Sequence, residues 1–259
     1  MSATNRYYDY SDDNFKGVFG SDGALYTNEN AQLTDTDNTT GAATKKTKVI
    51  LKGTLCKSDG TALTIVRRLG SYFVDDANQT KLKESILNQL ETGGYNYYYP
   101  TEHGRQQITK DDINIVIAKQ EENEDSKNNC YVYAQLTKDA EKKTWYTSLD
   151  ETETTTVAYT TINTNLANKN IVDWALVWKS GMTYYYYVIK HLDESNENGV
   201  VRNHIYDTKV TKIAGLGTPV YDPDQVIYPE KPDPNDHYIA AEVKILSWRI
   251  VSNDYELEW

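Results

Sequence analysis

The sequence predicts an all-β protein, because tyrosine-rich segments with alternating apolar side chains recur along it between turn signals. Aromatic residues make up 12% of the 259 residues, and 22 Tyr stand against 3 Phe. Tyrosine suits strands that are apolar on one face and wet on the other, since its ring packs while its hydroxyl reaches water. A disordered acidic chain would be poor in aromatic residues. The composition therefore indicates a folded domain, which we expect to be a β-sandwich or barrel.

The first elements along the chain are predicted to be a hairpin and one short helix. Residues 49–55 have a strand pattern, a turn follows at residues 58–60, and residues 61–66 are the expected hairpin partner. The helix begins after residues 78–80 and ends at Gly93-Gly94, because glycine adopts the left-handed backbone of a helix C-cap. Its apolar residues recur at helical spacing and are Leu82, Ile86, Leu87 and Leu90. We expect so short a helix to cover a sheet edge rather than to build the core.

Strands dominate the chain from there to residue 210. The expected strands cover residues 113–117, 130–136, 155–162, 171–179, 183–190 and 200–210. In the second of them, Val132, Ala134 and Leu136 alternate with tyrosine or glutamine, which predicts one buried face. Acidic, Asn-rich or glycine-containing connections separate several of these strands. Such a density of strands is typical of a sandwich or barrel.

A proline-rich segment follows, with five of the six prolines between Pro219 and Pro234. Proline fixes its own backbone angle and favours extended conformations in the residue before it. The segment is therefore predicted to be a stiff arm that cannot join a central strand. We divide the chain into a β-sandwich domain over residues 1–218 and, in residues 219–259, the arm and C-terminal strand of the same domain.

The last segment, residues 241–259, has an apolar strand pattern that changes phase twice. Such changes predict a bulge or a segment buried on both faces. Two hypotheses stay open: the strand closes this domain's own sheet, or it is donated to the open sheet edge of another molecule. The candidate donor-strand residues are Val243, Ile245, Leu246, Trp248, Ile250, Val251, Tyr255, Leu257 and Trp259. Three acidic residues alternate with the last of them, namely Asp254, Glu256 and Glu258.

Charge and hydropathy exclude two classes of partner. The chain has 38 Asp and Glu against 27 Lys and Arg, a formal net charge of -11. A nucleic-acid binder needs a clustered excess of cations, and an anionic membrane surface would repel this chain. No run of about 18 apolar residues occurs, so we predict no membrane insertion.

No pattern of catalytic or metal-binding residues is present. The four histidines do not have zinc-ligand spacing, and the acidic clusters lack the fixed glycine and final glutamate of a calcium loop. Neither a phosphate-binding glycine loop nor a nucleophile elbow occurs. We therefore predict a protein that is not an enzyme, with no cofactor and no metal.

Two further features allow alternative interpretations. Cys56 and Cys130 are the two cysteines, and they either form one disulfide or remain separate thiols in strands. The tyrosine runs at residues 97–99 and 184–187 either form an aromatic platform for sugars or a partner, or place tyrosine on both faces of a strand. The second interpretation is favoured, because period two sends alternate residues to opposite faces.

Several strings in the C-terminal part resemble the C-terminal domain of Bacteroidales fimbrillins, in particular the shaft subunits of minor fimbriae. These strings are Gly-Val-Val-Arg-Asn-His-Ile-Tyr at 199–206, Ile-Ala-Gly-Leu-Gly-Thr-Pro at 213–219, Pro-Glu-Lys-Pro at 229–232 and Ile-Leu-Ser-Trp-Arg at 245–249. The resemblance covers about residues 183–259 and, more weakly, residues 45–92. From the strand pattern, His204 and Tyr206 should lie on one face and Ile205 on the other, in a role that specifies the fold.

The resemblance implies a type V pilus subunit with a transthyretin-like β-sandwich. Members are exported as lipoproteins and trimmed by an arginine-specific protease, which opens a groove for the C-terminal strand of the next subunit. In this chain the matching donor segment is about residues 243–259. The implied partners are other fimbrial subunits in a homopolymer, with anchor and tip subunits, and a host or bacterial surface receptor.

The implied location is extracellular, in a surface fimbrium attached to the outer membrane. The sequence shows neither a lipobox cysteine nor a recognisable N-terminal domain, so we expect the C-terminal half of a longer subunit or a shortened member. The alternative function is a tip adhesin or carbohydrate-binding module that uses the tyrosine runs.

Overall fold

The computed structural model describes residues 48–118, 131–189, 200, 204–213, 215–223 and 239–247. Over these ranges the strands form sheets of five, four, three and two strands, with two α-helices beside them. The all-β prediction is therefore confirmed, and the arrangement is consistent with a β-sandwich. The prediction of a single short helix is wrong, because the described residues contain two.

The five-stranded sheet is the centre of the molecule. Its order is β3 (Ser71–Asp75), β2 (Thr64–Arg68), β10 (Ala175–Trp178), β7 (Tyr131–Leu136) and β6 (Ile113–Ile117), with all neighbours antiparallel. In β7 the alternation predicted from the sequence is confirmed, since Val132, Ala134 and Leu136 are buried. All four residues of β10 are buried, because apolar side chains cover both faces of this central strand.

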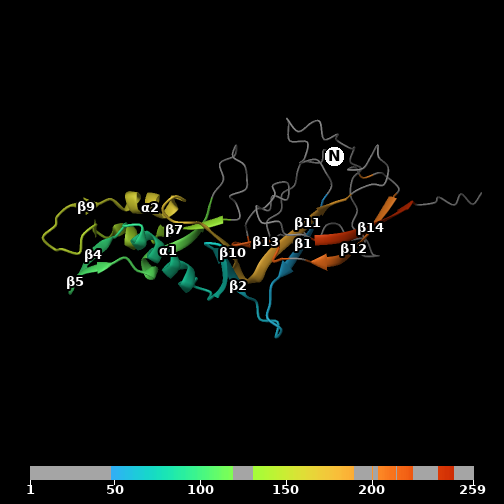
Figure 1. The fold of residues 1–259 in the computed structure, drawn as a ribbon, viewed down its shortest axis with the longest axis horizontal. Helices are drawn as coiled ribbons and strands as arrows, with labels where there is room; N and C mark the ends of the chain where they lie inside the picture. Colours follow the sequence, from blue (N-terminus) through green and yellow to red (C-terminus); the bar gives the residue numbers. More distant parts are fainter. Residues whose placement is uncertain are drawn as a thin grey trace, which may run out of the picture.

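Three smaller sheets extend the molecule on both sides. One contains β5 (Gly104–Gln107), β4 (Tyr98–Thr101), β8 (Trp145–Tyr146) and β9 (Thr156–Val157). A second contains β1 (Lys48–Thr54), β11 (Met182–Val188) and β13 (Thr218–Pro219), and the third pairs β12 (His204–Ile213) with β14 (Ile239–Ser247). Figure 1 shows β4, β5 and β9 at one end of the long axis, β2 and β10 near the middle, and β12 and β14 toward the other end.

Helix α1 (Thr80–Thr92) has the predicted extent but not the predicted role. Its apolar stripe of Leu82, Ile86 and Leu90 is at most 1% exposed and forms part of the main core, so the helix does more than cover an edge. Residues 78–80 do not supply a side-chain cap. Instead the Asp75 carboxylate, at the end of β3, accepts hydrogen bonds from the backbone N–H groups of Lys81 and Leu82 at 3.0 and 2.8 Å.

Helix α2 (Tyr159–Ala167) replaces the second half of a strand that the sequence predicted over residues 155–162. Of this range, only Thr156–Val157 form a strand. Ile162 and Leu166 are fully buried in the main core one helical turn apart. Packing of this pair decides the conformation, because the weak local preferences of threonine and asparagine are easily overridden by tertiary contacts.

The first hairpin is shorter than predicted. Asp59 accepts a hydrogen bond from Thr61 N–H at 2.8 Å in the expected turn, and Leu63 N–H donates to Leu55 O at 2.9 Å. Beyond this point the strands separate, and β1 pairs with β11 while β2 pairs with β3 and β10. The turn is therefore as predicted, but its two arms enter different sheets.

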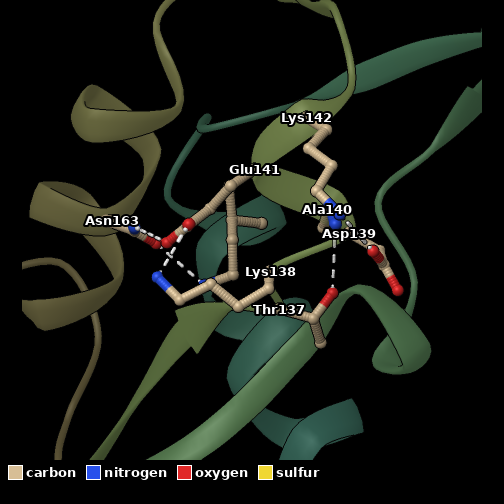
Figure 2. A network of polar contacts seen from close by, with 8 residues as sticks. Thr137, Lys138, Asp139, Ala140, Glu141, Lys142 and Asn163 are labelled. Atoms are coloured by element: carbon tan, nitrogen blue, oxygen red, sulfur yellow. Dashed lines mark hydrogen bonds and ion pairs between the residues drawn. The ribbon is translucent and has the colours of Figure 1, made fainter.

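A short 3₁₀ helix, η6 (Ala140–Lys142), closes the turn after β7 and connects it to α2. Figure 2 shows its surface ion pairs, Lys138–Glu141 at 3.0 Å and Lys142–Asp139 at 2.9 Å. Exposed pairs of this kind contribute at most about 1 kcal/mol. Asn163 of α2 connects that helix directly to β7, because its Oδ1 accepts a hydrogen bond from Leu136 N–H at 2.8 Å at the end of the strand.

Three tyrosines make stability sensitive to alkaline pH. Burial raises the pKa of Tyr185 and Tyr221 above the ordinary value of 10.0, and burial likewise outweighs the hydrogen bond from Asn165 and raises the pKa of Tyr97. A folded-state pKa above the unfolded value means that the unfolded chain loses the proton first. Their contribution to stability is therefore complete below pH 10.0 and is lost as the pH rises through the folded pKa.

We expect the free energy of unfolding, measured by urea denaturation, to fall as the pH rises from neutral to about 11. In a titration followed by tyrosinate absorbance, some tyrosines should ionise at a higher pH than the exposed ones. Tyr221→Phe removes one such group, and this variant should lose less stability over the same pH range than the wild type. An identical loss in both proteins would contradict a role for Tyr221 in the alkaline transition.

Candidate functional site

The candidate site is the two-stranded ribbon formed by β12 and β14, which contains the described part of the predicted donor segment. The strands are antiparallel and pair from His204 with Ser247 to Ile213 with Ile239. One irregularity interrupts the register, between Val210 and Lys212 of β12. Pairing is regular from Ala241 to Ser247, so the phase change predicted between Ile245 and Leu246 is not a bulge in this strand.

The register gives the ribbon two unlike faces. On one face Asp207 is paired with Lys244 and Lys209 with Glu242, so opposite charges occupy directly opposed positions. The other face has apolar or weakly polar residues at its paired positions, namely Tyr206 with Ile245, Thr208 with Val243, Val210 with Ala241 and Ile213 with Ile239. Val210 and Ile213 are 38% and 56% exposed. The charged pairs share their face with Ile205, which is paired with Leu246 and is 44% exposed, so exposed apolar residues of β12 occur on both faces of the ribbon.

The described residues bear out the expected faces. His204 and Tyr206 lie on the same face with ring centroids 6.5 Å apart, and Ile205 lies on the opposite face. Val243 and Ile245 occupy positions on one face and Leu246 a position on the other. The remaining predicted donor residues lie outside the described residues: Trp248, Ile250, Val251, Tyr255, Leu257 and Trp259.

The loop that follows β12, residues 215–218, is held by side chains from β10 and β11. Trp178 Nε1 donates to Gly217 O at 3.1 Å, and Tyr185 Oη donates to Gly215 O at 3.0 Å. Thr183 Oγ1 lies 2.6 Å from Leu216 O and 3.0 Å from Thr218 O. All four carbonyls of this glycine loop thus have a side-chain donor within reach. The loop is therefore fixed on the body by side-chain hydrogen bonds.

The start of the proline-rich arm is packed against the body. Pro219 pairs with Thr183 at the edge of a sheet, where proline is tolerated because it has no N–H to donate. Val220 is 0% exposed, and its N–H donates to Met182 O at 3.1 Å. The Tyr221 hydroxyl lies 3.1 Å from Gln79 Oε1 and 3.2 Å from Ile115 O. The arm is therefore anchored through residues 219–221.

The tyrosine runs do not form an open platform. In the first, Tyr97 is 3% exposed and hydrogen-bonded to Asn165, and Tyr99 packs edge-on against Trp145. In the second, Tyr184 and Tyr185 are 5% and 8% exposed although they point to opposite faces of β11. The favoured interpretation, tyrosine on both faces of a strand, is confirmed for Tyr184 and Tyr185 of the second run.

Cys56 is exposed, and its Sγ lies 3.6 Å from Thr54 O. Cys130 lies outside the described residues, so the predicted disulfide is not tested. Among the described residues, no group of three or more His, Cys, Asp or Glu is placed to hold a metal ion. Within that same part of the chain, no helix is both long and apolar enough to cross a membrane.

Sequence reasoning missed the residues that hold the glycine loop. Trp178 and Thr183 lie more than 30 residues before the carbonyls they bond, and no local period connects them. The available signal was the string Gly-Leu-Gly-Thr-Pro itself, since two glycines before a proline indicate a backbone with special angles.

Fold and site together define an all-β protein whose last described strand belongs to a ribbon reached by an anchored arm. Residues 177–254 match the family model described as "Major fimbrial subunit protein type IV, Fimbrillin, C-terminal". The match confirms the resemblance over these residues and supports a fimbrillin C-terminal domain there. The match supports a structural subunit of a cell-surface fimbrium that assembles with other fimbrial subunits. No curated protein and no solved structure matches the chain.

Proposed function

We propose that this chain is a shaft subunit of a bacterial surface fimbrium and polymerises by donating its C-terminal strand to a neighbouring subunit. Residues 1–218 form the body, and residues 219–259 form the arm and the donated strand. Main-chain hydrogen bonds along the neighbour's open sheet edge supply affinity, and alternate apolar side chains set the register. The proposal includes a transthyretin-like sandwich and attachment of the fimbrium to the outer membrane, with anchor and tip subunits as further partners.

One observation carries the proposal: the last described strand lies outside the five-stranded sheet. β14 is paired with β12 alone among the described strands. The arm before it is anchored at Val220 and Tyr221, so the start of the arm is fixed on the body. Loss of the terminal residues should therefore leave the body folded. That separation of folding from assembly is what a donated strand requires.

Deleting residues 251–259 tests the proposal. We expect the truncated chain to keep the circular dichroism and urea midpoint of the full chain and to form no polymers by light scattering and electron microscopy. A matched pair of point variants probes the two faces of the segment. Leu257→Ser should reduce assembly strongly, while Glu256→Gln, on the opposite parity, should reduce it much less.

Two results would contradict strand donation. Polymerisation of the truncated chain would show that the terminal residues are not the donor. Unfolding of the truncated chain would show that the terminal strand belongs to the domain's own sheet.

A further inference from the structure

Each outer strand of the five-stranded sheet has a backbone carbonyl that a side chain from elsewhere contacts. On β3, the Lys81 ammonium group donates to Val74 O at 2.9 Å. On β6, the Tyr221 hydroxyl lies 3.2 Å from Ile115 O. Proteins commonly cover sheet edges, because free edge backbone can pair with another chain. The two covers differ in origin, since Lys81 belongs to the helix directly after β3, whereas Tyr221 belongs to the start of the proline-rich arm.

The hydrogen bonds around β6 show which of its backbone groups face outward. Ala118 N–H donates to Tyr131 O at 2.9 Å, so these two residues form a hydrogen-bonded pair between the strands. Leu136 N–H, at the other end of β7, donates to Asn163 and not to β6. Hydrogen-bonded and non-hydrogen-bonded pairs alternate in an antiparallel ladder. In β6 the residues whose N–H and C=O groups point away from β7 are therefore Ile113, Ile115 and Ile117.

The β6 edge is complementary to a second copy of itself. Residues 113–117 read Ile-Asn-Ile-Val-Ile and contain no charge, proline or glycine, which is typical of segments that associate when exposed. In an antiparallel alignment centred on Ile115, Ile113 of one copy faces Ile117 of the other. The outward backbone groups belong to these same residues. Every hydrogen-bonded pair in such an alignment would thus join isoleucine to isoleucine.

Tyr221 has a built seat on this edge. Its ring packs against the main core cluster, which contains Ile113 and Ile115, and the Lys179 ammonium group lies 4.6 Å from the ring centre. Its hydroxyl also lies 3.1 Å from Gln79 Oε1. The preceding residue, Val220, is fully buried. The ring is therefore held from several sides at the middle of the edge.

Gln79, which helps to form the seat, is in an unfavourable conformation. Its φ is 55°, in the left-handed region, and it is 5% exposed. Among the described residues its Nε2 has no hydrogen-bond partner, although burial makes an unpaired donor costly. Such features persist where the surrounding structure fixes them, and they cluster at functional contacts. The side-chain contact that Gln79 makes is the one that holds Tyr221 on β6.

We propose that Tyr221 is an autoinhibitory contact: seated on β6, it prevents this edge from pairing antiparallel with the same edge of a second copy of this chain. Contact between identical surfaces is isologous and closes as a dimer. It is distinct from strand donation, because it uses neither residues 243–259 nor a filament. Since Tyr221 belongs to the arm, the edge is closed only while the start of the arm is seated.

The test is the self-association of the full chain, measured by sedimentation equilibrium in the Leu257→Ser background, so that association through the proposed donor segment is weakened. Tyr221→Ala should dimerise at least about tenfold more tightly than its parent, because the edge is uncovered. Adding Asn114→Lys, an exposed position of β6, should reverse this gain, since lysine on an edge strand opposes pairing. The control Tyr159→Ala removes a tyrosine that is 43% exposed on α2 and should leave association unchanged.

Hydrogen exchange locates the contact. In Tyr221→Ala, the amides of residues 113–117 should become more protected as the protein concentration rises, and in the parent they should not. Circular dichroism and urea midpoints verify folding. If Tyr221→Ala unfolds, Tyr221→Leu replaces it, because leucine keeps apolar packing but has no hydroxyl to reach Ile115 O.

Two results would overturn the autoinhibitory contact. One is a folded Tyr221 variant that associates no more tightly than its parent. The other is a gain in association that persists with Asn114→Lys or leaves the exchange of residues 113–117 unchanged, because the new contact then lies elsewhere. Neither result bears on strand donation, which the truncation experiment judges separately.

Discussion

Replacing Arg68 by methionine is expected to lower the free energy of unfolding by about 3 kcal/mol. An apolar side chain suits a buried strand position, so the loss comes from the hydrogen bonds that methionine cannot make. Arg68 is 3% exposed. Its Nε donates to Asp173 O at 3.2 Å, its Nη1 donates to Ser85 O at 3.1 Å, and its Nη2 donates to Gln89 Oε1. Removal of the guanidinium leaves these acceptors in a site that water reaches poorly, and each unsatisfied group costs about 1–3 kcal/mol.

The same guanidinium connects three elements. Ser85 and Gln89 belong to α1, Arg68 ends β2, and Asp173 precedes β10. Gln89 also bonds Asp173 directly, with its Nε2 donating to Asp173 Oδ2 at 3.1 Å. Burial lowers the pKa of Arg68 and the charge of Asp173 opposes that effect, so the side chain stays a cation.

Arg67→Met is the matched control for Arg68→Met. Arg67 is half-buried on the opposite face of the same strand, and its described contact is with the Tyr72 ring. We expect this variant to lose less than about 1 kcal/mol in urea denaturation. Equal losses in the two variants would contradict the network as the source of stability.

Gly217→Ala is expected to destabilise the body by about 3 kcal/mol and to weaken assembly as well. Gly217 has a φ of +72°, and a Cβ there would lie 2.3 Å from Thr183 Oγ1 and 2.9 Å from Tyr184 O. The strand backbone cannot give way, so the glycine loop would move. Movement separates the loop carbonyls from Trp178, Thr183 and Tyr185, which together position the start of the arm.

Gly60→Ala separates steric conflict from backbone strain. Gly60 has a φ of +84°, but a Cβ there would meet nothing within 4 Å. Its substitution should therefore cost only the left-handed penalty, about 1–2 kcal/mol, and should leave assembly unchanged. The free energies of unfolding of both variants are measured by urea denaturation. If Gly217→Ala lowers this free energy no more than Gly60→Ala does, the glycine loop can move to accommodate the Cβ without a further cost.

The elements that the sequence predicted well are those whose signal is local. The alternation of Val132, Ala134 and Leu136 marks β7, and the spacing of Leu82, Ile86 and Leu90 marks α1. Residues 155–162 show the limit of such signals: a threonine-rich run suggests a strand, yet burial of Ile162 and Leu166 makes the second half of it part of a helix. Local preference yields wherever long-range packing is worth more.

Part of the candidate site could likewise be predicted from local sequence patterns, and part could not. The parity of Val243, Ile245 and Leu246 could be read from the sequence, and the register of β14 agrees with it. The identity of the pairing strand could not, because strand pairing joins residues at any separation along the chain. The bonds that hold the glycine loop were equally hidden, since a buried polar contact leaves no periodic trace in the sequence.

The sequence by itself determined an all-β chain, its acidic surface, the resemblance to fimbrillins and the alternating pattern of its last segment. Only the tertiary structure decided that Arg68 and Trp178 hold distant elements together, that α1 and α2 contribute to the core, and that β3 is the outermost described strand of the five-stranded sheet. The physical reason is that patterning reports which face of an element is buried. Which element buries it is set by contacts between residues far apart in sequence, as when β1 pairs with β11.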